Sequence, residues 1–267
     1  MEHHAVGTPL PKKRMGQHFL SDPQIARSIV DVSGVKPGDR VVEIGPGLGA
    51  LSHPLLMQVK KLWAIELDEQ LIPVLMHRMR GVGELHVELG DALRVDYREL
   101  AMRMGGELRI VANLPYNVSS PLLLHFLEYR DVIAEMTLMF QTEVAERIAA
   151  RPGTKAYGTL SVLCGMWMHG RIVMTVPPEA FRPPPKVMSS VLHLVRRATP
   201  LAETRDPIVF MQVVRAAFGQ RRKVLSNALK VMHRDPKEWL LRAGIHPDRR
   251  GETLSIEEFA HLANCHD

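Results

Sequence analysis

Three short runs in the first half of the chain have residue types that could bind a nucleoside, and each follows a stretch typical of a β-strand. The first is the glycine-rich run EIGPGLG at 43–49, the second ends in Glu66, and the third ends in Gly-Asp-Ala at 90–92. Glycines after a strand let a ligand approach the backbone closely. Glu66 comes 21 residues after Gly45, the spacing at which a carboxylate meets ribose hydroxyls. Asp91 would accept a hydrogen bond from an adenine amino group.

Each of these features also has an ordinary explanation. The glycine spacing is GxGxG rather than the GxGxxG of dinucleotide sites, and the acid suits NAD and S-adenosylmethionine equally. Taken alone, Asp91 would cap a helix and Glu66 would be a solvated surface acid. Because glycine, Glu and Asp end three successive strands, we predict a cofactor site that includes Gly45, Glu66 and Asp91.

The fourth strand ends in the run Asn113-Leu-Pro-Tyr116, which suits chemistry on a nucleobase amine. Such an amine is a poor nucleophile because its lone pair is delocalised into the ring. Hydrogen bonds to the side-chain oxygen of Asn113 and the main-chain oxygen of Leu114 would favour the pyramidal nitrogen that attacks a sulfonium methyl group. Tyr116 offers a ring for the base to stack on. The alternative is a plain turn after a strand.

The pattern of the chain up to about residue 197 predicts strands alternating with amphipathic helices. Five strands are expected at 40–44, 62–67, 84–89, 108–112 and 135–140, and two closing strands at 171–176 and 190–195. Asp22 followed by Pro23 predicts the start of the first helix. We expect an α/β, Rossmann-like sheet, mostly parallel with an antiparallel last strand, over residues 1–200, and a small all-helical domain over 201–267.

Positive charge is concentrated in the predicted helical domain. Between residues 205 and 250 there are eleven Lys or Arg and four Asp or Glu, a net charge of +7, although the whole chain carries only +5. Such asymmetry favours a polyanionic partner, most often nucleic acid, and a solvated helix face is the alternative. The candidate RNA-binding residues are Arg221, Arg222 and Lys223, with Lys12, Lys13 and Arg14 near the start of the chain.

Several classes of protein are disfavoured by the sequence. The 267 residues contain two cysteines without a CxxC pair and no HExxH, so we expect no metal site and no disulfide framework. No stretch approaches the roughly 18 apolar residues of a membrane helix, and the start lacks the apolar segment of a secretory signal. We therefore expect a cytoplasmic protein that does not contact a membrane.

Together these motifs resemble an S-adenosylmethionine-dependent methyltransferase that acts on a nucleobase amine. From residue 12 to 264 the chain is similar to the kasugamycin-sensitivity family, the small-subunit ribosomal RNA adenine dimethyltransferases. The segments that carry this similarity are KRMGQHFL at 13–20, QTEVAER at 141–147, KAYG at 155–158, FRPPPKVMS at 181–189, AFGQRRK at 217–223 and RGETL at 250–254.

The resemblance implies roles for individual residues. His18 and Leu20 would contact the cofactor, with Gly45, Glu66, Asp91 and Asn113 lining the rest of its pocket. The family commonly has Asn at the position of His18, so His18 would either reach the methionine carboxylate or only pack. Phe181 matches an aromatic that would hold the target adenine against Tyr116, although an aromatic beside prolines is ordinarily a core residue. The implied catalytic set is Asn113, Leu114, Tyr116 and Phe181.

The activity implied by the resemblance is transfer of methyl groups from S-adenosylmethionine to N6 of two adjacent adenosines near the 3′ end of 16S rRNA. The product would be N6,N6-dimethyladenosine, the substrate a partly assembled small ribosomal subunit, and the enzyme a monomer. Two alternatives from other classes remain: a related large-subunit rRNA adenine methylase, and an assembly or RNA-binding factor in which methylation is incidental. An NAD dehydrogenase is disfavoured because the glycine spacing and an evident hydride-transfer acid are lacking.

Overall fold

A computed structural model of the chain describes residues 17–266, which divide into two compact units. The first unit takes in the chain up to Ala145 together with Arg171–Arg196. The second takes in Glu146–Gly170 together with the chain from Arg197 onwards. The second unit therefore includes residues 146–170, which the sequence analysis placed in the first domain. Lys12, Lys13 and Arg14 lie outside the described residues.

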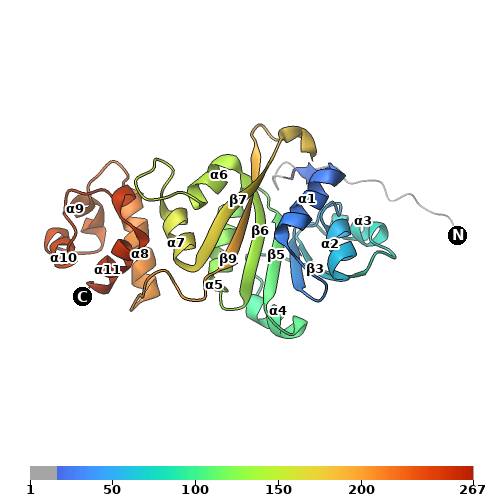
Figure 1. The fold of residues 1–267 in the computed structure, drawn as a ribbon, viewed down its shortest axis with the longest axis horizontal. Coiled ribbons are helices and arrows are strands. Elements are labelled where there is room, and N and C mark those ends of the chain that lie inside the picture. The colour runs from blue at the N-terminus through green and yellow to red at the C-terminus, as the bar shows by residue number, and fades with distance from the viewer. Residues whose placement is uncertain (1–16, 267) are drawn as a thin grey trace. The chain divides into compact units, whose positions relative to one another are not determined.

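A seven-stranded sheet forms the centre of the first unit (Figure 1). Its strand order is β4-β3-β2-β5-β6-β9-β7. The strands are β2 (Arg40–Ile44), β3 (Lys61–Glu66), β4 (Glu84–Leu89), β5 (Leu108–Asn113), β6 (Ile133–Gln141), β7 (Met168–Val176) and β9 (Ser189–Arg196). Strands β4, β3, β2, β5 and β6 run parallel, whereas β9 is antiparallel to β6, with Ser189 opposite Gln141. The predicted α/β sheet with an antiparallel last strand is confirmed.

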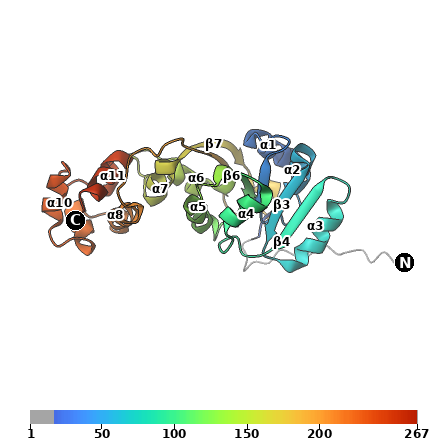
Figure 2. The ribbon, with the colours of Figure 1, turned by 90° about the horizontal axis from the view of Figure 1, so that it is seen from below.

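Helices cover both faces of this sheet (Figure 2). On one face α1 (Pro23–Ser33), α2 (Ser52–Val59) and α3 (Ile72–Arg78) supply apolar side chains to a single buried cluster with the strands. The other face is covered by α4 (Tyr97–Met104) and α5 (Ser119–Glu128), which meet where the ring of Tyr97 packs edge-on against Phe126. Because both faces are buried, the carboxyl edge of the parallel strands is the natural place for a ligand.

Local sequence signals account for the start of α1. The side chain of Asp22 accepts hydrogen bonds from the backbone N–H groups of Gln24 and Ile25, and Pro23 stands at the first helical position. This satisfies donors that a helix start leaves free, and Pro loses nothing there. Gly34 ends the helix in a left-handed conformation. The predicted capping of this helix is confirmed.

A second, two-stranded sheet joins distant parts of the chain within the first unit. Strand β1 (Phe19–Leu20) pairs antiparallel with β8 (Phe181–Arg182), so that Leu20 lies opposite Phe181. Both side chains are buried, and Phe181 has no exposed surface. They belong to the same apolar cluster as α1 and α2. This pairing holds residues 17–20 over the carboxyl edge of the large sheet.

The second unit is helical. Its helices are α7 (Thr159–Trp167), α8 (Pro207–Gly219), α9 (Leu225–Ala228), α10 (Pro236–Arg242) and α11 (Ile256–Asn264), and α6 (Thr142–Ile148) spans the point where the chain enters the unit. Four 3-10 turns occur in the described chain: η2 (Glu69–Leu71), η3 (Pro178–Ala180), η4 (Leu229–Val231) and η5 (Gly251–Thr253).

Buried aromatic residues form the core of the helical unit. Trp239 is fully buried, and its indole N–H donates to the carbonyl of Leu262 at 2.9 Å. Ser255 and Glu258 form a reciprocal capping box at the start of α11, and Arg249 pairs with the same Glu258. Among residues 17–266, none of the helices is long and apolar enough to cross a membrane.

Candidate active site

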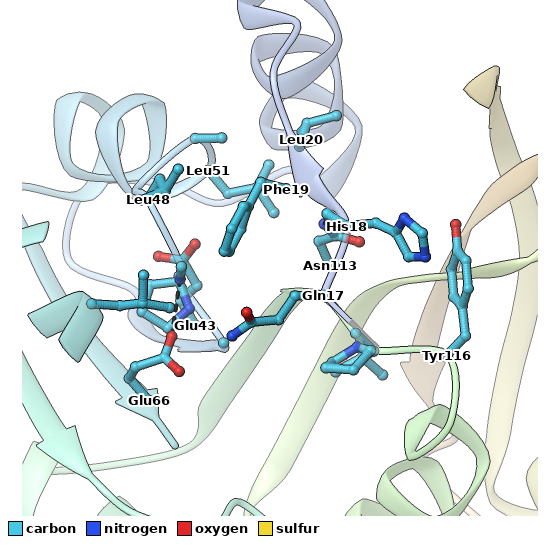
Figure 3. A pocket seen from close by; sticks show the side chains of 17 residues that line it. Gln17, His18, Phe19, Leu20, Glu43, Leu48, Leu51, Glu66, Asn113 and Tyr116 are labelled. Atoms are coloured by element: carbon cyan, nitrogen blue, oxygen red, sulfur yellow. Dashed lines mark hydrogen bonds between the residues drawn. The ribbon is translucent and has the colours of Figure 1, made fainter. Parts of the chain in front are cut away.

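Two adjoining cavities lie at the carboxyl ends of the central strands. Gln17, Gly45, Glu66 and Pro115 line both of them. The first cavity is also lined by His18, Phe19, Leu20, Glu43, Asn113, Leu114 and Tyr116 (Figure 3). The second is also lined by Leu67, Gly90, Asp91 and Asn117. All the predicted cofactor residues therefore lie around one continuous region, with Glu66 at its middle.

The glycine-rich loop owes its shape to backbone conformations that other residues adopt only with strain. Gly45 and Gly47 both have positive φ angles, of 63° and 56°. The space beside Gly45 is open, because a Cβ atom built there meets nothing within 4 Å. A Cβ at Gly47 would instead lie 3.1 Å from the ring of Phe19. The loop thus leaves room for a ligand at Gly45 and is covered by β1 at Gly47.

Glu66 is a buried carboxylate rather than a surface acid. It is only 4% exposed, and its two oxygens accept hydrogen bonds from the backbone N–H groups of Gly47, at 3.0 Å, and Asp68, at 2.8 Å. Burial raises the pKa of Glu66, and these two donors act in the opposite direction. The interpretation as a solvated surface acid is wrong. Each oxygen keeps a second lone pair, with which it can accept a ribose hydroxyl.

A second buried acid, Glu43, was not singled out by the sequence analysis. It is 2% exposed in the floor of the first cavity and lies 2.6 Å from the hydroxyl of Ser52. Burial raises its pKa to about 8, and the nearby charge of Glu66 adds to the increase. The signal in the sequence was an acid among the apolar residues of a buried strand, two residues before the first glycine.

Asp91 lies in a tight turn after β4 rather than at the start of a helix. One of its oxygens accepts from the N–H of Leu93 at 3.0 Å, and its other oxygen is 3.9 Å from Arg94. Its side chain stays 40% exposed at the second cavity. Leu67, directly after Glu66, is 56% exposed beside the same cavity. An acceptor and an apolar surface therefore face the space next to Glu66.

Asn113 is the last residue of β5, and its side chain is oriented by the amino-terminal segment. Its Nδ2 donates to the main-chain oxygen of His18 at 3.1 Å. Because the amide nitrogen is turned towards His18, Oδ1 points to another side and remains an acceptor. Leu114 is buried, 1% exposed as a whole residue, and it also lines the first cavity. The predicted pair of oxygens thus belongs to a rigid corner of the first cavity.

The ring of Tyr116 stacks on His18 and not on Phe181. The rings of His18 and Tyr116 are stacked, with centroids 5.5 Å apart and planes 28° apart (Figure 3). The Nδ1 atom of His18 is 2.8 Å from the carbonyl oxygen of Pro183. Phe181 does not line either cavity and lies wholly within the apolar cluster. The described structure therefore brings Asn113, Leu114 and Tyr116 together but leaves Phe181 in the core.

The amino-terminal segment supplies further cavity residues. Leu20 is 6% exposed and belongs to the core as well as to the cavity wall. The side chain of Gln17 extends across the cavity towards Glu43 and Glu66 (Figure 3). The sequence analysis named His18 and Leu20 from this segment but not Gln17. Only the similarity of the run KRMGQHFL could have suggested Gln17, because nothing in its local spacing marks it.

The three candidate RNA-binding residues follow α8 in the helical unit, and all are exposed. Arg221 has a structural partner: its guanidinium donates to the carbonyl oxygens of Lys155, at 2.8 Å, and Tyr157, at 3.0 Å. These bonds tie the turn after α8 to the loop before α7. Arg222 and Lys223 make no such contact among the described residues, and their charges are available to a ligand.

Comparison with known proteins gives a consistent result. The profile of the family described as "Ribosomal RNA adenine dimethylase" matches residues 10–267. The chain belongs to the ribosomal RNA adenine dimethylase family. A protein of Magnetococcus marinus named "Ribosomal RNA small subunit methyltransferase A" is 48% identical, covering 99% of this chain and 94% of the relative. Its namesake in Syntrophotalea carbinolica is also 48% identical, covering 95% and 96%.

Two solved structures have a similar fold. A dimethyladenosine transferase from Plasmodium falciparum is 26% identical with a TM-score of 0.75, covering 92% of this chain and 96% of that one. The 23S rRNA methyltransferase ErmE has a TM-score of 0.70 at 24% identity, covering 93% and 99%. At that identity ErmE shows the fold alone. The predicted family and the predicted methyltransferase fold are confirmed.

The raised pKa of Glu43 leads to a prediction about the pH dependence of stability. The pKa of Glu43 is about 8 in the folded protein, against an ordinary value of 4.5. Between these values the folded state holds one proton more than the unfolded state, so the free energy of unfolding falls as pH rises. Glu43→Gln carries no such proton. We therefore expect the free energy of unfolding of Glu43→Gln to rise relative to that of the unsubstituted protein as pH increases from about 4.5 to about 8.

Urea unfolding at a series of pH values measures this difference directly. Above about pH 8 the two curves should run parallel, because Glu43 is then ionised in the folded and in the unfolded protein alike. A difference in unfolding free energy that stays constant from pH 5 to pH 9 would contradict the raised pKa.

Proposed function

We propose that this protein transfers methyl groups from S-adenosylmethionine to N6 of two adjacent adenosines near the 3′ end of 16S rRNA. The product is N6,N6-dimethyladenosine, formed during assembly of the small ribosomal subunit. The observation that carries the proposal is the corner where Asn113, Leu114 and Tyr116 face a buried Glu66 across one cavity. The names of the relatives at 48% identity support the small subunit as the source of the RNA.

The residues around the two cavities fit an adenosyl donor. Glu66 presents a buried carboxylate with lone pairs to spare for two ribose hydroxyls. Asp91 and the exposed Leu67 lie beside it, as an acceptor for an adenine amino group and an apolar surface for its ring. The open space at Gly45 lets the donor approach the backbone. The methionine end would then lie in the first cavity, near Gln17, His18 and Leu20.

The chain itself contributes orientation and fixed dipoles. S-adenosylmethionine, when bound, supplies an electrophilic methyl group on a sulfonium. Asn113 Oδ1 and the main-chain oxygen of Leu114 accept hydrogen bonds from the adenine amine and favour the nitrogen geometry that attacks. Tyr116 supports the base by stacking. Because these acceptors are held by His18 and by the buried Leu114 side chain before any substrate arrives, little reorganisation is needed.

No general base is required for this transfer. A carbonyl oxygen accepts a hydrogen bond but does not remove the proton, and the surplus proton leaves to water after the nitrogen has gained its methyl group. The raised pKa of Tyr116 keeps its hydroxyl protonated at neutral pH, so it does not serve as a base. Catalysis by this site therefore rests on alignment and electrostatic stabilisation.

RNA recognition divides between the two units. The target adenine must be unpaired or extruded to reach Asn113. Arg222 and Lys223, with the surrounding basic residues of the helical unit, would bind phosphates and read folded shape more than sequence. We propose that the protein acts as a monomer in the cytoplasm, where its ribosomal substrate is assembled.

Two alternatives have less support. A large-subunit methylase shares the fold, but the similarity to ErmE is 24% in sequence whereas the small-subunit relatives reach 48%. An assembly factor with incidental methylation has no need of the preoriented Asn113 and the buried Glu66. Both of these features favour an active enzyme.

A methyl-transfer assay tests the proposal as a whole. The full chain is incubated with radiolabelled S-adenosylmethionine and small subunits that lack the modification, and the rRNA is then digested to nucleosides. We expect label in N6,N6-dimethyladenosine at two adjacent positions near the 3′ end. Large subunits serve as the control RNA. Label confined to large-subunit RNA, or none in either, would refute the function.

The role of Asn113 is tested by Asn113→Ala. Removing one preoriented acceptor should lower methyl transfer by about 100-fold, as the loss of a single polar group at such a site does. Calorimetry should still detect donor binding, because Glu66 and the glycine loop are unchanged. Turnover equal to that of the unsubstituted enzyme would refute the assigned role.

The helical unit generates a prediction about salt. Replacing Arg222 and Lys223 by Ala should weaken RNA binding and reduce the slope of log affinity against log salt by about 1 to 2. Arg221 is left in place because it holds the Lys155 and Tyr157 backbone. The control pair is Lys36→Ala with Lys61→Ala, exposed residues in the loop before β2 and at the first position of β3, where Lys61 pairs with Glu84. Equal slopes for the two double variants would show that phosphate binding lies elsewhere.

A further inference from the structure

The ring of Tyr116 must keep one orientation if it is to present a base to Asn113, and the backbone alone does not fix it. The χ2 torsion of a tyrosine is broad. Tyr116 stands in a turn after β5 rather than in a helix or strand, and it is only half-buried. A base stacked on a ring that rocks would carry its amine away from the two acceptor oxygens, and small misplacements of reacting atoms are costly to rate.

Ser189 holds this ring from its far end. Its hydroxyl lies 2.6 Å from the hydroxyl of Tyr116. Ser189 is fully buried and is the first residue of β9, where it pairs with Gln141 of β6. The bond therefore ties the ring of Tyr116 to a buried residue at the start of a strand of the central sheet. Burial that raises the pKa of Tyr116 also keeps its hydroxyl available as a donor.

His18 restrains the same ring from its face. Its imidazole stacks on Tyr116 and is itself held by the contact of Nδ1 with the carbonyl of Pro183. Pro183 and Ser189 come from the segment that follows β8. Pro183 thus reaches Tyr116 through His18 and Ser189 reaches it directly, whereas Phe181 of β8 is buried in the core.

We propose that Ser189 is a positioning residue for methyl transfer, which fixes the plane of Tyr116 so that a base stacked on it presents its amine to Asn113. The inference rests on the proposed function and adds to it a residue that touches neither donor nor base. It also assigns the Tyr116 hydroxyl a mechanical role: the hydroxyl is an anchor for the ring and takes no part in proton transfer.

The chain offers a matched control in the next residue. Ser190 is equally buried, and its hydroxyl makes a comparable bond, 2.9 Å to Thr142 Oγ1. Because successive side chains of a strand point to opposite faces, Ser190 is directed away from Tyr116. Ser189→Ala and Ser190→Ala therefore each remove one buried hydrogen bond from the same strand, but only the first releases the ring.

The test measures steady-state methyl transfer to unmethylated small subunits, together with donor affinity by calorimetry and thermal stability. We expect Ser189→Ala to lower kcat about tenfold with the KM and affinity for the donor unchanged. Ser190→Ala should keep kcat within about twofold of the unsubstituted enzyme while losing a similar amount of thermal stability. Equal kcat for the two variants would overturn the inference, because Ser189 would then be structural only.

A double-mutant cycle with Tyr116→Phe supplies the decisive readout. If the hydroxyl of Tyr116 is only an anchor, Tyr116→Phe, Ser189→Ala and the double variant should all lose about the same tenfold in kcat. Losses that multiply in the double variant would overturn the inference, as would a Tyr116→Phe enzyme with full kcat. If the unsubstituted enzyme itself fails to methylate small subunits, the proposed function is at fault rather than the role of Ser189.

Discussion

The pairing of β1 with β8 is the constraint on which the site depends. It joins residues about 160 positions apart through only two register pairs, Phe19 with Arg182 and Leu20 with Phe181. Two register pairs would be a weak link alone, but the buried side chains of Leu20 and Phe181 join them to the main apolar cluster. Because of this anchor, the His18 carbonyl reaches Asn113 and the His18 ring reaches Tyr116.

The same constraint explains why Phe181 does not lie where the resemblance implied, and where the ring of His18 lies. An aromatic next to three prolines in a loop looks available for stacking, yet Phe181 is in a strand whose inner face is the core. His18, whose role the sequence left open, occupies the face of Tyr116 instead. The roles of both residues in catalysis remain predictions: the His18 ring covers one face of Tyr116, so a base stacked on Tyr116 would use the other face.

Much of the fold could be predicted because its signals are local. Strands β2 and β4 have the predicted bounds, and the Asp22 cap with Pro23 begins α1 as expected. Strand β1 has two residues, and neither its alternation nor its length marks it as a strand. Helix α4 was not among the predicted elements, although the Asp96 side chain caps its start and Tyr97, Leu100 and Ala101 are buried. Pairing across distant segments leaves no periodic trace in either partner.

The candidate site shows the same division between local and distant information. Gly45, Glu66, Asp91 and Asn113 end strands, so their meeting at one edge follows from a parallel sheet. Glu43 and Ser189 carry no such signal, because their importance comes from burial and from partners that only the folded chain supplies. The two carboxyl groups in this cavity have different hydrogen-bond donors. Glu66 accepts from two backbone N–H groups, whereas Glu43 accepts from the hydroxyl of Ser52, and burial raises the pKa of Glu43 to about 8.

The helical unit is assembled from two separate stretches of chain, Glu146–Gly170 and the part from Arg197 onwards. Helix α7 comes from the first stretch and packs against α8 and α11, which come from the second. During synthesis, α7 is therefore made before α8 and α11. Its apolar side can be covered only after these two helices have been added. Exchange of this unit between relatives by recombination would likewise need three crossovers, at both ends of the first stretch and at the start of the second, rather than one.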